Sequence, residues 1–379
     1  MRIEQYHWTK EGGWSPKLGT DPNENMQLIM IFGAAPAMTE TCLFEDLKRK
    51  FPKAHAFGCS TAGEICNTRV FDNSLVATCI EFERSRFMGV KIKLGKTVDS
   101  YRAGEILAKS LDKEGLKHIF VLSDGLHVNG SELAQGLTKN LPEDVTVTGG
   151  LAADADRFEK TCVLWDCLPE DNLLAAIGFY GSSLKIGYGS MGGWDPFGPD
   201  RVITRSEGNV LFELDGQSAL GIYKKYLGEH AKGLPSTALL FPLSIRTKNR
   251  EAGIVRTILG INDEKESMTF AGDIPQGAYA RFMKANFERL IDGSQGAAKT
   301  SAGAMGAVHT DLAVLVSCVG RKLVLKQRIE EEVEAASEIL GKQAFLAGFY
   351  SYGEISPFTV GAKCELHNQT MTITTFGET

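Results

Sequence analysis

The chain has 379 residues, of which 43% are hydrophobic and 23% are charged. This is the composition of a globular protein long enough for two domains or for one domain built from repeats. A formal net charge of −6 argues against a nucleic-acid-binding protein, which needs a basic surface. No apolar run approaches the roughly 20 residues of a membrane span, and residues 1–10 lack the apolar core of a signal peptide, so we expect no membrane and a cytoplasmic location.

The eight cysteines show none of the spacings of a metal site. No CxxC occurs, and no histidine lies at zinc-finger distance from a cysteine. Several cysteines, such as Cys79, lie inside apolar runs, so we expect buried free thiols.

The first part of the chain alternates apolar runs with an amphipathic segment. Residues 1–25 are polar and rich in glycine and proline, which indicates an N-terminal arm or an edge strand. The expected elements that follow are a buried strand over 26–32, a helix over about 39–49, and strands over 74–82 and 87–94.

The middle of the chain repeats this order. We expect helices over about 101–113 and 131–141, strands over 118–122, 145–148, 160–165, 172–180 and 182–190, and a Gly/Pro-rich loop over 192–199. A helix beginning near Ser218 is expected to join two halves of the protein.

The last part opens with an apolar run over 238–243, and we expect a strand near 254–259, helical stretches over 276–292 and a soft Gly-Ser-Ala segment over 293–307. A strand over 312–318 and a helix over 328–340 follow.

Three glycine corners suggest a repeated unit. An apolar run ends in a glycine corner around Gly58, Gly149 and Gly348, and each time a helix precedes the run and a strand follows it. The unit is strand, helix, strand, glycine corner, strand. A crossover helix favours a parallel pair and a tight corner an antiparallel one, so the predicted fold is α/β (α+β), with two halves of mixed sheets covered by helices. No glycine-rich phosphate-binding motif opens a helix.

These blocks resemble the FIST family, a sensory module with an N-terminal and a C-terminal part. The resemblance spans roughly residues 26–375, and its blocks are 58–65, 149–154, 208–216, 317–321, 348–355 and 365–370. It implies an N-terminal arm over 1–25, a FIST N-terminal domain over 26–217 and a FIST C-terminal domain over 218–379.

The resemblance implies a sensor of signal transduction and not an enzyme. The chain is similar in length to a bacterial branch of free-standing FIST proteins, the NosP-like proteins, which bind haem, sense nitric oxide and control a histidine kinase. It therefore implies haem as cofactor and a histidine kinase or cyclic-di-nucleotide enzyme as partner; a homo-oligomer is also possible. FIST modules are also thought to sense amino acids or other small anionic metabolites, which stays open as an alternative.

Haem needs an axial ligand, which is usually a histidine. His127 lies between a predicted strand and a helix start, where open α/β sheets place ligands, and His367 lies in the strand after the third corner. These two are the candidate axial ligands, with a hydrogen-bonded structural histidine as the alternative for each.

A metabolite site would use other groups. Arg321 could grip a carboxylate or pair internally with Glu354 or Glu365, and the helix start at Asn129 offers N–H groups to an anion. Trp194 and Tyr352 could supply aromatic walls. The predicted ligand-binding residues are His127, Asn129, Gly149, Gly150, Asp154, Trp194, Arg321, Tyr352, Glu354 and Asn368.

A hydrolase or transferase is the third hypothesis. Cys59 or Ser60 at the first corner could be a nucleophile, with His55 or His127 as base. The corner has Ala62 where a nucleophile elbow has its last glycine, and the other two corners carry no matching nucleophile.

Overall fold

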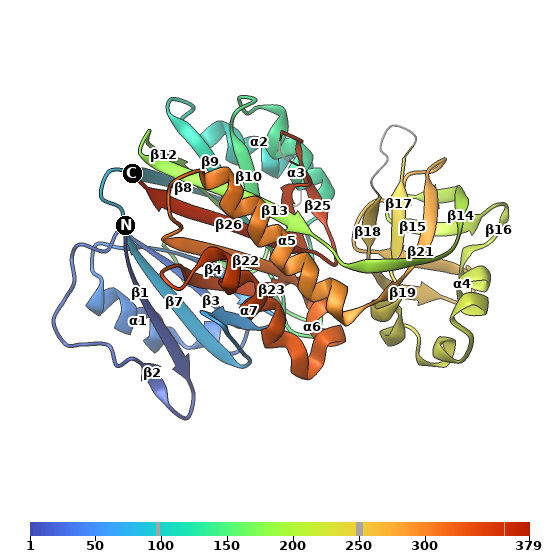
Figure 1. Cartoon of the computed structure of the whole chain (residues 1–379), viewed down its shortest axis with the longest axis horizontal. Coiled ribbons are helices and arrows are strands. Elements are labelled where there is room, and N and C mark those ends of the chain that lie inside the picture. The colour runs from blue at the N-terminus through green and yellow to red at the C-terminus, as the bar shows by residue number, and fades with distance from the viewer. Residues whose placement is uncertain (96–98, 248–252, 360) are drawn as a thin grey trace.

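Copies of one strand–helix unit make up most of the structure, which is a computed structural model describing residues 1–95, 99–247, 253–359 and 361–379. In these residues the unit occurs three times, and a smaller β-rich lobe stands at one end (Figure 1). The predicted mixed α/β class with its repeated unit is confirmed. The three copies are arranged in a ring, in which the sheet of each copy includes at least one strand from another copy.

Each unit contributes a parallel pair joined by a helical crossover. The pairs are β3 (Leu28–Ala34) with β4 (His55–Thr61), β9 (Leu116–Ser123) with β10 (Thr146–Leu151), and β22 (Leu312–Cys318) with β23 (Phe345–Ser351). An antiparallel strand then pairs with the first strand of that pair, and another strand flanks it.

The first sheet has the order β11-β4-β3-β7-β1-β2 and carries α1. Its elements are β1 (Arg2–Thr9), β2 (Gly13–Ser15), β3 (Leu28–Ala34), α1 (Thr41–Lys50), β4 (His55–Thr61), β7 (Ser74–Glu81) and β11 (Val163–Trp165).

The second sheet has the order β25-β24-β10-β9-β12-β8 and carries α2 and α3. Its elements are β8 (Arg86–Lys93), α2 (Ser100–Ser110), β9 (Leu116–Ser123), α3 (Gly130–Lys139), β10 (Thr146–Leu151), β12 (Leu173–Tyr180), β24 (Gly353–Pro357) and β25 (Cys364–His367).

The third sheet has the order β13-β26-β22-β23-β5-β6 and carries α5, α6 and α7. Its elements are β5 (Glu64–Cys66), β6 (Arg69–Phe71), β13 (Leu184–Met191), α5 (Phe287–Met305), β22 (Leu312–Cys318), α6 (Val319–Leu325), α7 (Ile329–Leu340), β23 (Phe345–Ser351) and β26 (Met371–Glu378).

The glycine corners exchange strands between the units. After its corner, each unit sends the next strand into a neighbouring sheet: β5 pairs with β23, β11 with β4, and β24 with β10. The inner faces of the three sheets meet in one apolar core, in which the rings of Phe32 and Phe349 lie 4.7 Å apart. The corners therefore interlock the three sheets.

A single glycine position in each unit permits this exchange. A Cβ on Gly58 would lie 1.9 Å from the carbonyl oxygen of Ile31, and one on Gly348 would lie 2.0 Å from that of Leu315. A Cβ on Gly149 would lie 1.9 Å from the carbonyl oxygen of Val121. The corner glycines thus let the two parallel strands approach more closely than any side chain allows.

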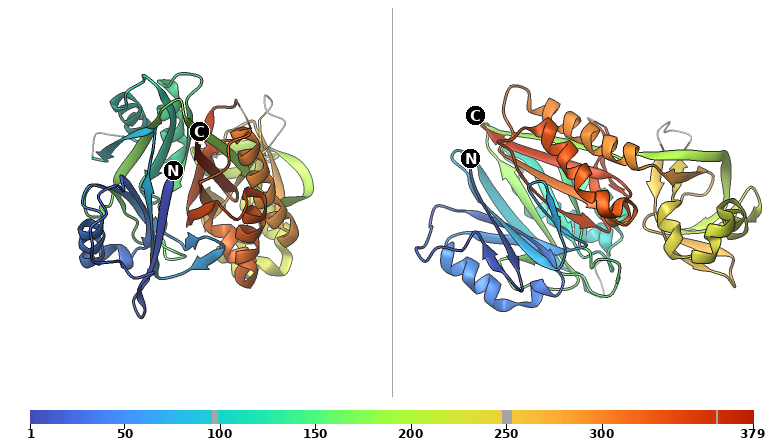
Figure 2. Two further views of the ribbon diagram at one scale, coloured as in Figure 1. Left: turned by 60° about the vertical axis from the view of Figure 1, so that its left-hand side comes forward. Right: turned by 60° about the horizontal axis from the view of Figure 1, so that its bottom comes forward.

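The lobe is an insertion into the third unit, between β13 and α5. The chain enters it along β14 and leaves along β21, which are antiparallel neighbours (Figures 1 and 2). Its elements are β14 (Trp194–Glu207), β15 (Val210–Leu214), β16 (Gln217–Ser218), α4 (Ala219–Leu227), β17 (Leu243–Arg246), β18 (Ile254–Arg256), β19 (Ile258–Asn262), β20 (Ser267–Phe270) and β21 (Tyr279–Ala285).

The lobe has its own apolar core, which includes Leu211, Tyr223 and Phe282. The helix expected to join two halves, α4, packs within this core, and the expected domain boundary at 217/218 falls inside the lobe.

Three local predictions were wrong. The expected loop over 192–199 is largely the start of β14, and the expected helix over 276–292 is β21 followed by the first turn of α5. The soft segment over 293–307 is mostly α5 itself. Its small residues let the helix lie directly on the sheet, where a Cβ on Gly187 would come within 2.0 Å of the Ser301 carbonyl oxygen.

No helix of the described residues is both long and apolar enough to cross a membrane.

We expect Gly58→Ala to lower the free energy of unfolding by more than about 3 kcal/mol, because the new Cβ meets a backbone carbonyl that cannot move without separating β3 from β4. Gly303→Ala is the matched control, because it lies on the exposed face of α5 with no atom within 4 Å of the added Cβ. It should be neutral or stabilise the protein by up to about 1 kcal/mol. Urea unfolding of both variants measures the difference, and similar values would contradict the role of the corner glycine.

Candidate functional site

A seam forms where the lobe meets the second unit. Asn129, the N-cap of α3, donates from Nδ2 to Asp273 Oδ1 of the lobe at 3.3 Å. Arg256 Nη1 of the lobe donates to the Leu366 carbonyl oxygen at 2.9 Å, and Gln369 Nε2 donates to Thr257 Oγ1 at 3.0 Å. Two cavities lie along this seam, one on either side of the Asn129–Asp273 bond.

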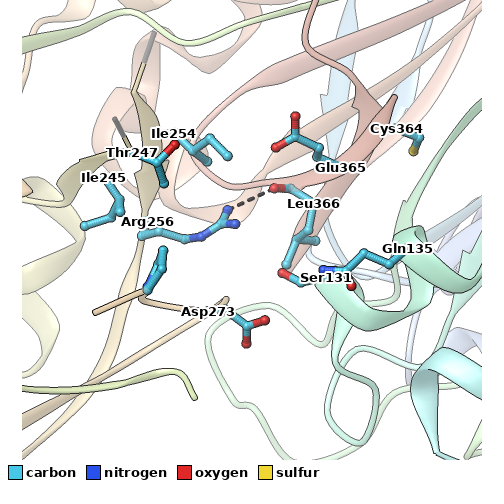
Figure 3. Close-up of a pocket in the computed structure, with 11 residues that line it drawn as sticks. Ser131, Gln135, Ile245, Thr247, Ile254, Arg256, Asp273, Cys364, Glu365 and Leu366 are labelled. Carbon is cyan, nitrogen blue, oxygen red and sulfur yellow. Dashed lines mark hydrogen bonds between the residues drawn. The ribbon is translucent and has the colours of Figure 1, made fainter. Parts of the chain in front are cut away.

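The first, which we call the Arg256 cavity, has a volume of about 310 Å³ (Figure 3). It is lined by Ser131 and Gln135 of α3, by Cys364, Glu365 and Leu366 of β25, and by lobe residues Ile245, Thr247, Ile254, Arg256, Asp273 and Pro275. Its volume lies at the lower end of the range of small-molecule sites in proteins.

Charges of both signs face this cavity. Arg256 is 6% exposed, and Figure 3 shows its guanidinium between the lobe and Leu366. Asp273 and Glu365, which also line the cavity, supply the negative charges. A ligand with both an anionic and a cationic group matches this distribution.

Ser131 has a hydroxyl available to a ligand. The residue is 8% exposed, and its Oγ has no hydrogen-bond partner in the described part of the chain. A buried hydroxyl without a partner costs free energy, which a ligand or a water molecule in the cavity would recover.

The second cavity, which we call the His127 cavity, has a volume of about 330 Å³. It is lined by residues 125–130, Leu151, Phe158 and Tyr352 of the core and by Asn209, Leu259, Phe270, Ala271 and Gly272 of the lobe. The rings of Phe158 and Tyr352 stack at 4.3 Å with an interplanar angle of 11°. This cavity is the more aromatic of the two.

His127 is held by a buried carboxylate. Its Nδ1 lies 3.1 Å from Asp124 Oδ1, and its side chain is 55% exposed. Burial opposes ionisation of Asp124, but the backbone N–H groups of Asn172, Leu126 and His127 outweigh it and lower the pKa of that carboxyl. Asp124 therefore stays ionised and fixes the imidazole through Nδ1, the arrangement in which metal-binding histidines are usually held.

Of the predicted site residues, the structure brings together His127, Asn129 and Tyr352 at the seam. Asp154 lies behind them: it is buried and accepts from Arg157 Nε and Lys160 N, at 2.9 and 3.2 Å. It thus shapes the loop that carries Phe158.

Other predicted residues have internal roles. Gly149 and Gly150 lie in β10 against the backbone of β9 and the side chain of Val316, respectively. Trp194 is 5% exposed and donates from Nε1 to the Gln369 carbonyl oxygen at 3.0 Å, next to the joint between core and lobe.

Arg321 is completely buried and paired within the protein. Its Nε and Nη2 donate to Glu332 Oε2 at 3.0 and 2.7 Å, and its other bonds go to the carbonyl oxygens of Gly192 and Leu290. The partner is neither Glu354 nor Glu365, and the guanidinium lines neither seam cavity. It is an internal ion pair that anchors α7.

The second candidate axial ligand, His367, is 1% exposed and bonds from Nε2 to the Ser356 carbonyl oxygen at 2.9 Å. It lines neither seam cavity. Asn368 beside it is also buried, and both atoms of its amide lack a hydrogen-bond partner in the described residues.

Two corners are closed by a buried carboxyl group. Glu64 accepts from Thr61 Oγ1 at 2.5 Å and from Ser74 Oγ at 2.6 Å, and Glu354 likewise accepts from Ser351 Oγ and Thr370 Oγ1, at 2.8 and 2.9 Å. Burial raises the pKa of Glu64 to about 7 and that of Glu354 to about 8.

The second corner has no such clamp. Thr61 and Ser351 stand three residues after their corner glycines, where the second corner has Ala152. This corner contributes Leu151 to the His127 cavity, so the repeat departs from its pattern beside a seam cavity.

The geometry gives no support to a nucleophile at the first corner. Cys59 is fully buried, and its burial raises the pKa of its thiol well above the ordinary value. Ser60 Oγ accepts from Cys162 N at 3.0 Å. Of the two proposed bases, His55 contacts Asp166, and His127 contacts Asp124.

No sequence motif points to the lobe side of the candidate site, namely Arg256 and Asp273, or to Ser131 and Phe158 of the core. Their elements are short strands and loops without a motif. The position of Ser131 in the first turn of a predicted helix was the one available signal.

Comparison with known proteins gives a family. The FIST N domain matches residues 27–217, and the FIST C domain matches residues 219–357. The chain is similar to the uncharacterized protein MJ1623 of Methanocaldococcus jannaschii, with 24% identity over 353 residues; the match covers 85% of this chain and 64%, slightly under two thirds, of that protein.

The chain also resembles solved structures, among them the following two. A chorismatase aligns over 99% of this chain and 98% of its own, with 8% identity and a TM-score of 0.37. A cyanuric acid hydrolase from A. caulinodans aligns over 78% of this chain and 99% of its own, with 11% identity and a TM-score of 0.18. Neither likeness is close enough to carry an argument.

We expect Glu354→Gln to change the pH dependence of stability. The pKa of Glu354 is raised from 4.5 to about 8 in the folded protein, so its contribution is fully present below pH 4.5 and is lost as the pH rises through about 8. The amide imitates the protonated acid, so the variant should match wild type at low pH and become relatively more stable, by a few kcal/mol, above pH 8. Urea unfolding across this range measures the difference. Glu334→Gln, on the exposed side of α7, is the control and should show no such trend.

Proposed function

Because the chain belongs to the FIST family, whose domains are associated with sensing small ligands in signal transduction, we propose that it is a sensory protein with its ligand at the seam between core and lobe. The observation that carries the proposal is the pair of cavities that flank the Asn129–Asp273 bond. Each is lined by both bodies, so a ligand in either one affects how the lobe is held. Cavities between domains are common ligand sites.

The geometry favours an amino acid or another small anionic metabolite in the Arg256 cavity. Arg256 and the hydroxyl of Ser131 suit a carboxylate, and Asp273 suits an ammonium group. Ile245, Ile254 and Leu366 add apolar surface for an aliphatic part. The volume of about 310 Å³ suits a molecule of this size.

Haem is the second candidate ligand, and the position of His127 is what favours it. Asp124 fixes this imidazole through Nδ1, and no hydrogen bond within the described residues occupies Nε2. The stacked pair Phe158–Tyr352 and Leu126 could face a macrocycle in the His127 cavity. Haem held there would supply an iron atom that takes nitric oxide, as in the NosP-like branch. His367, with Nε2 bonded to Ser356, is the weaker axial ligand.

The output would pass to a separate protein. We propose a histidine kinase or a cyclic-di-nucleotide enzyme as the partner, with the change in lobe position as the signal. The setting would be a bacterial cytoplasm, and the protein could form a homo-oligomer.

We expect at least one member of a panel of L-amino acids and small carboxylates to raise the thermal midpoint of the wild-type protein. At a hundredfold excess over Kd, a ligand specific for the native state adds about 2.7 kcal/mol to stability. Ser131→Ala should weaken binding roughly tenfold through the loss of one hydrogen bond, and Arg256→Met should weaken it further.

The control for this experiment is Arg205→Met, which removes an exposed arginine of the lobe and should bind like wild type. If no compound stabilises the wild type, or if the Ser131 and Arg256 variants bind as it does, the metabolite proposal is wrong.

For haem, the measurement is the absorption spectrum during titration with haem and then with nitric oxide. We expect an intense Soret band that shifts with nitric oxide and is lost in His127→Ala. His309→Ala removes an exposed histidine that lines neither seam cavity, so this variant should behave like wild type. A wild-type spectrum equal to that of free haem would rule out this ligand.

A further inference from the structure

The turn over residues 367–370 is a part of the core that is hydrogen-bonded to the lobe. It carries the chain from β25 in the second sheet to β26 in the third. On the lobe side, Gln369 Nε2 bonds to Thr257 Oγ1 at 3.0 Å. At the joint, the Gln369 carbonyl oxygen accepts from Trp194 Nε1, and on the core side the Thr370 N–H donates to Glu354 Oε2, also at 3.0 Å.

Three buried side-chain atoms of this turn have no hydrogen-bond partner in the described residues. Asn368 is 1% exposed, and neither Nδ2 nor Oδ1 of its amide has a hydrogen-bond partner in the described residues. Gln369 Oε1 is also buried and also lacks a hydrogen-bond partner in the described residues. Native proteins pair nearly all such groups, so several unpaired atoms in adjacent residues call for an explanation.

The backbone of the same turn is constrained. Gln369 has φ 64°, in the left-handed region that residues other than glycine seldom adopt. Its side-chain amide lies against Gly320, where a Cβ would come within 2.3 Å of Nε2. Strain of this kind persists only when the surroundings hold it, and here one of the holders is Thr257 of the lobe.

We infer that the 367–370 turn is a conformational switch with two states, set by the position of the lobe. In the described state, Gln369 bonds the lobe and the Asn368 amide stays buried and unpaired. In the other state, the lobe moves away with Thr257, and the Asn368 amide gains water as its partner. The inference that ligand binding selects between them rests on the proposed function, because Leu366, one residue before the turn, lines the Arg256 cavity.

Hydrogen exchange of the ligand-free protein tests the switch. Asn368→Leu keeps the side-chain shape but removes the unpaired amide, so it should favour the described state and slow the exchange of seam amides in 125–131 and 270–275 severalfold. Thr257→Val removes the lobe's bond to Gln369 and should speed the same amides severalfold. Asn368→Ala repeats the first arm with a smaller side chain. Amides of β9 and β22 in the core should exchange as in wild type.

If Asn368 and Thr257 had a merely structural role, the two substitutions would not change hydrogen exchange at the seam in opposite directions. If both Asn368→Leu and Thr257→Val speed exchange at the seam, or if the changes spread equally to β9 and β22, the switch is overturned. Unchanged seam exchange in both variants overturns it as well.

A second arm adds L-amino acids one at a time. Any compound that stabilises wild type by closing the seam should bind severalfold more tightly to Asn368→Leu and more weakly to Thr257→Val. Equal binding to the three proteins would overturn the link between ligand and switch. If no compound binds to wild type, the metabolite proposal fails, while the ligand-free exchange still decides whether the switch exists.

Discussion

The architecture depends on a close approach of backbone to backbone at three places. At Gly58, Gly149 and Gly348, the second strand of each parallel pair lies so near the first that only a hydrogen atom fits between them. This approach lets the chain turn the corner and join the next sheet, so that each unit completes its neighbour. The consequence is a centre filled with apolar side chains, such as Phe32, Phe120 and Val316. The two seam cavities accordingly lie at the margin, where the lobe meets the ring.

The repeat also shows where its copies differ. In the first and third corners a glutamate accepts hydrogen bonds from hydroxyl groups, whereas the second corner has Ala152 and Ala155 at the equivalent positions. An apolar cavity of about 410 Å³ lies beside α1, and none of its lining residues belongs to the lobe. The Arg256 cavity beside α3, by contrast, is lined by residues of both the core and the inserted lobe.

The sequence allowed the repeated unit, most strands of the core and the helices α1, α3 and α7 to be predicted, because period and capping are local signals. The prediction was wrong where small residues allow close packing. The Gly-Ser-Ala run of α5 is typical of a flexible segment, yet its small side chains are what let the helix pack directly against β13. The segment Tyr279–Ala285 is a strand, although its pattern also fits a helix, because short amphipathic runs are compatible with either period.

The candidate site, too, was predictable only in part. His127, Asn129 and Tyr352 were predicted because each stands next to a recognisable corner or helix start. Arg321 misled, since a charged residue after a strand is the same in sequence whether it faces a ligand or, as here, Glu332. Arg256 and Asp273 reach the seam only through the tertiary placement of an insertion, which no local pattern encodes.

The way the lobe is inserted has an evolutionary consequence. Its first and last strands run side by side, with Trp194 opposite Ala285, so the chain leaves the ring and returns to it at nearly the same point. A lobe could therefore be lengthened, exchanged or remodelled while the order of strands in the ring stays as it is. Proteins built on this scaffold could in this way differ in the lobe face of the seam while the core face stays the same.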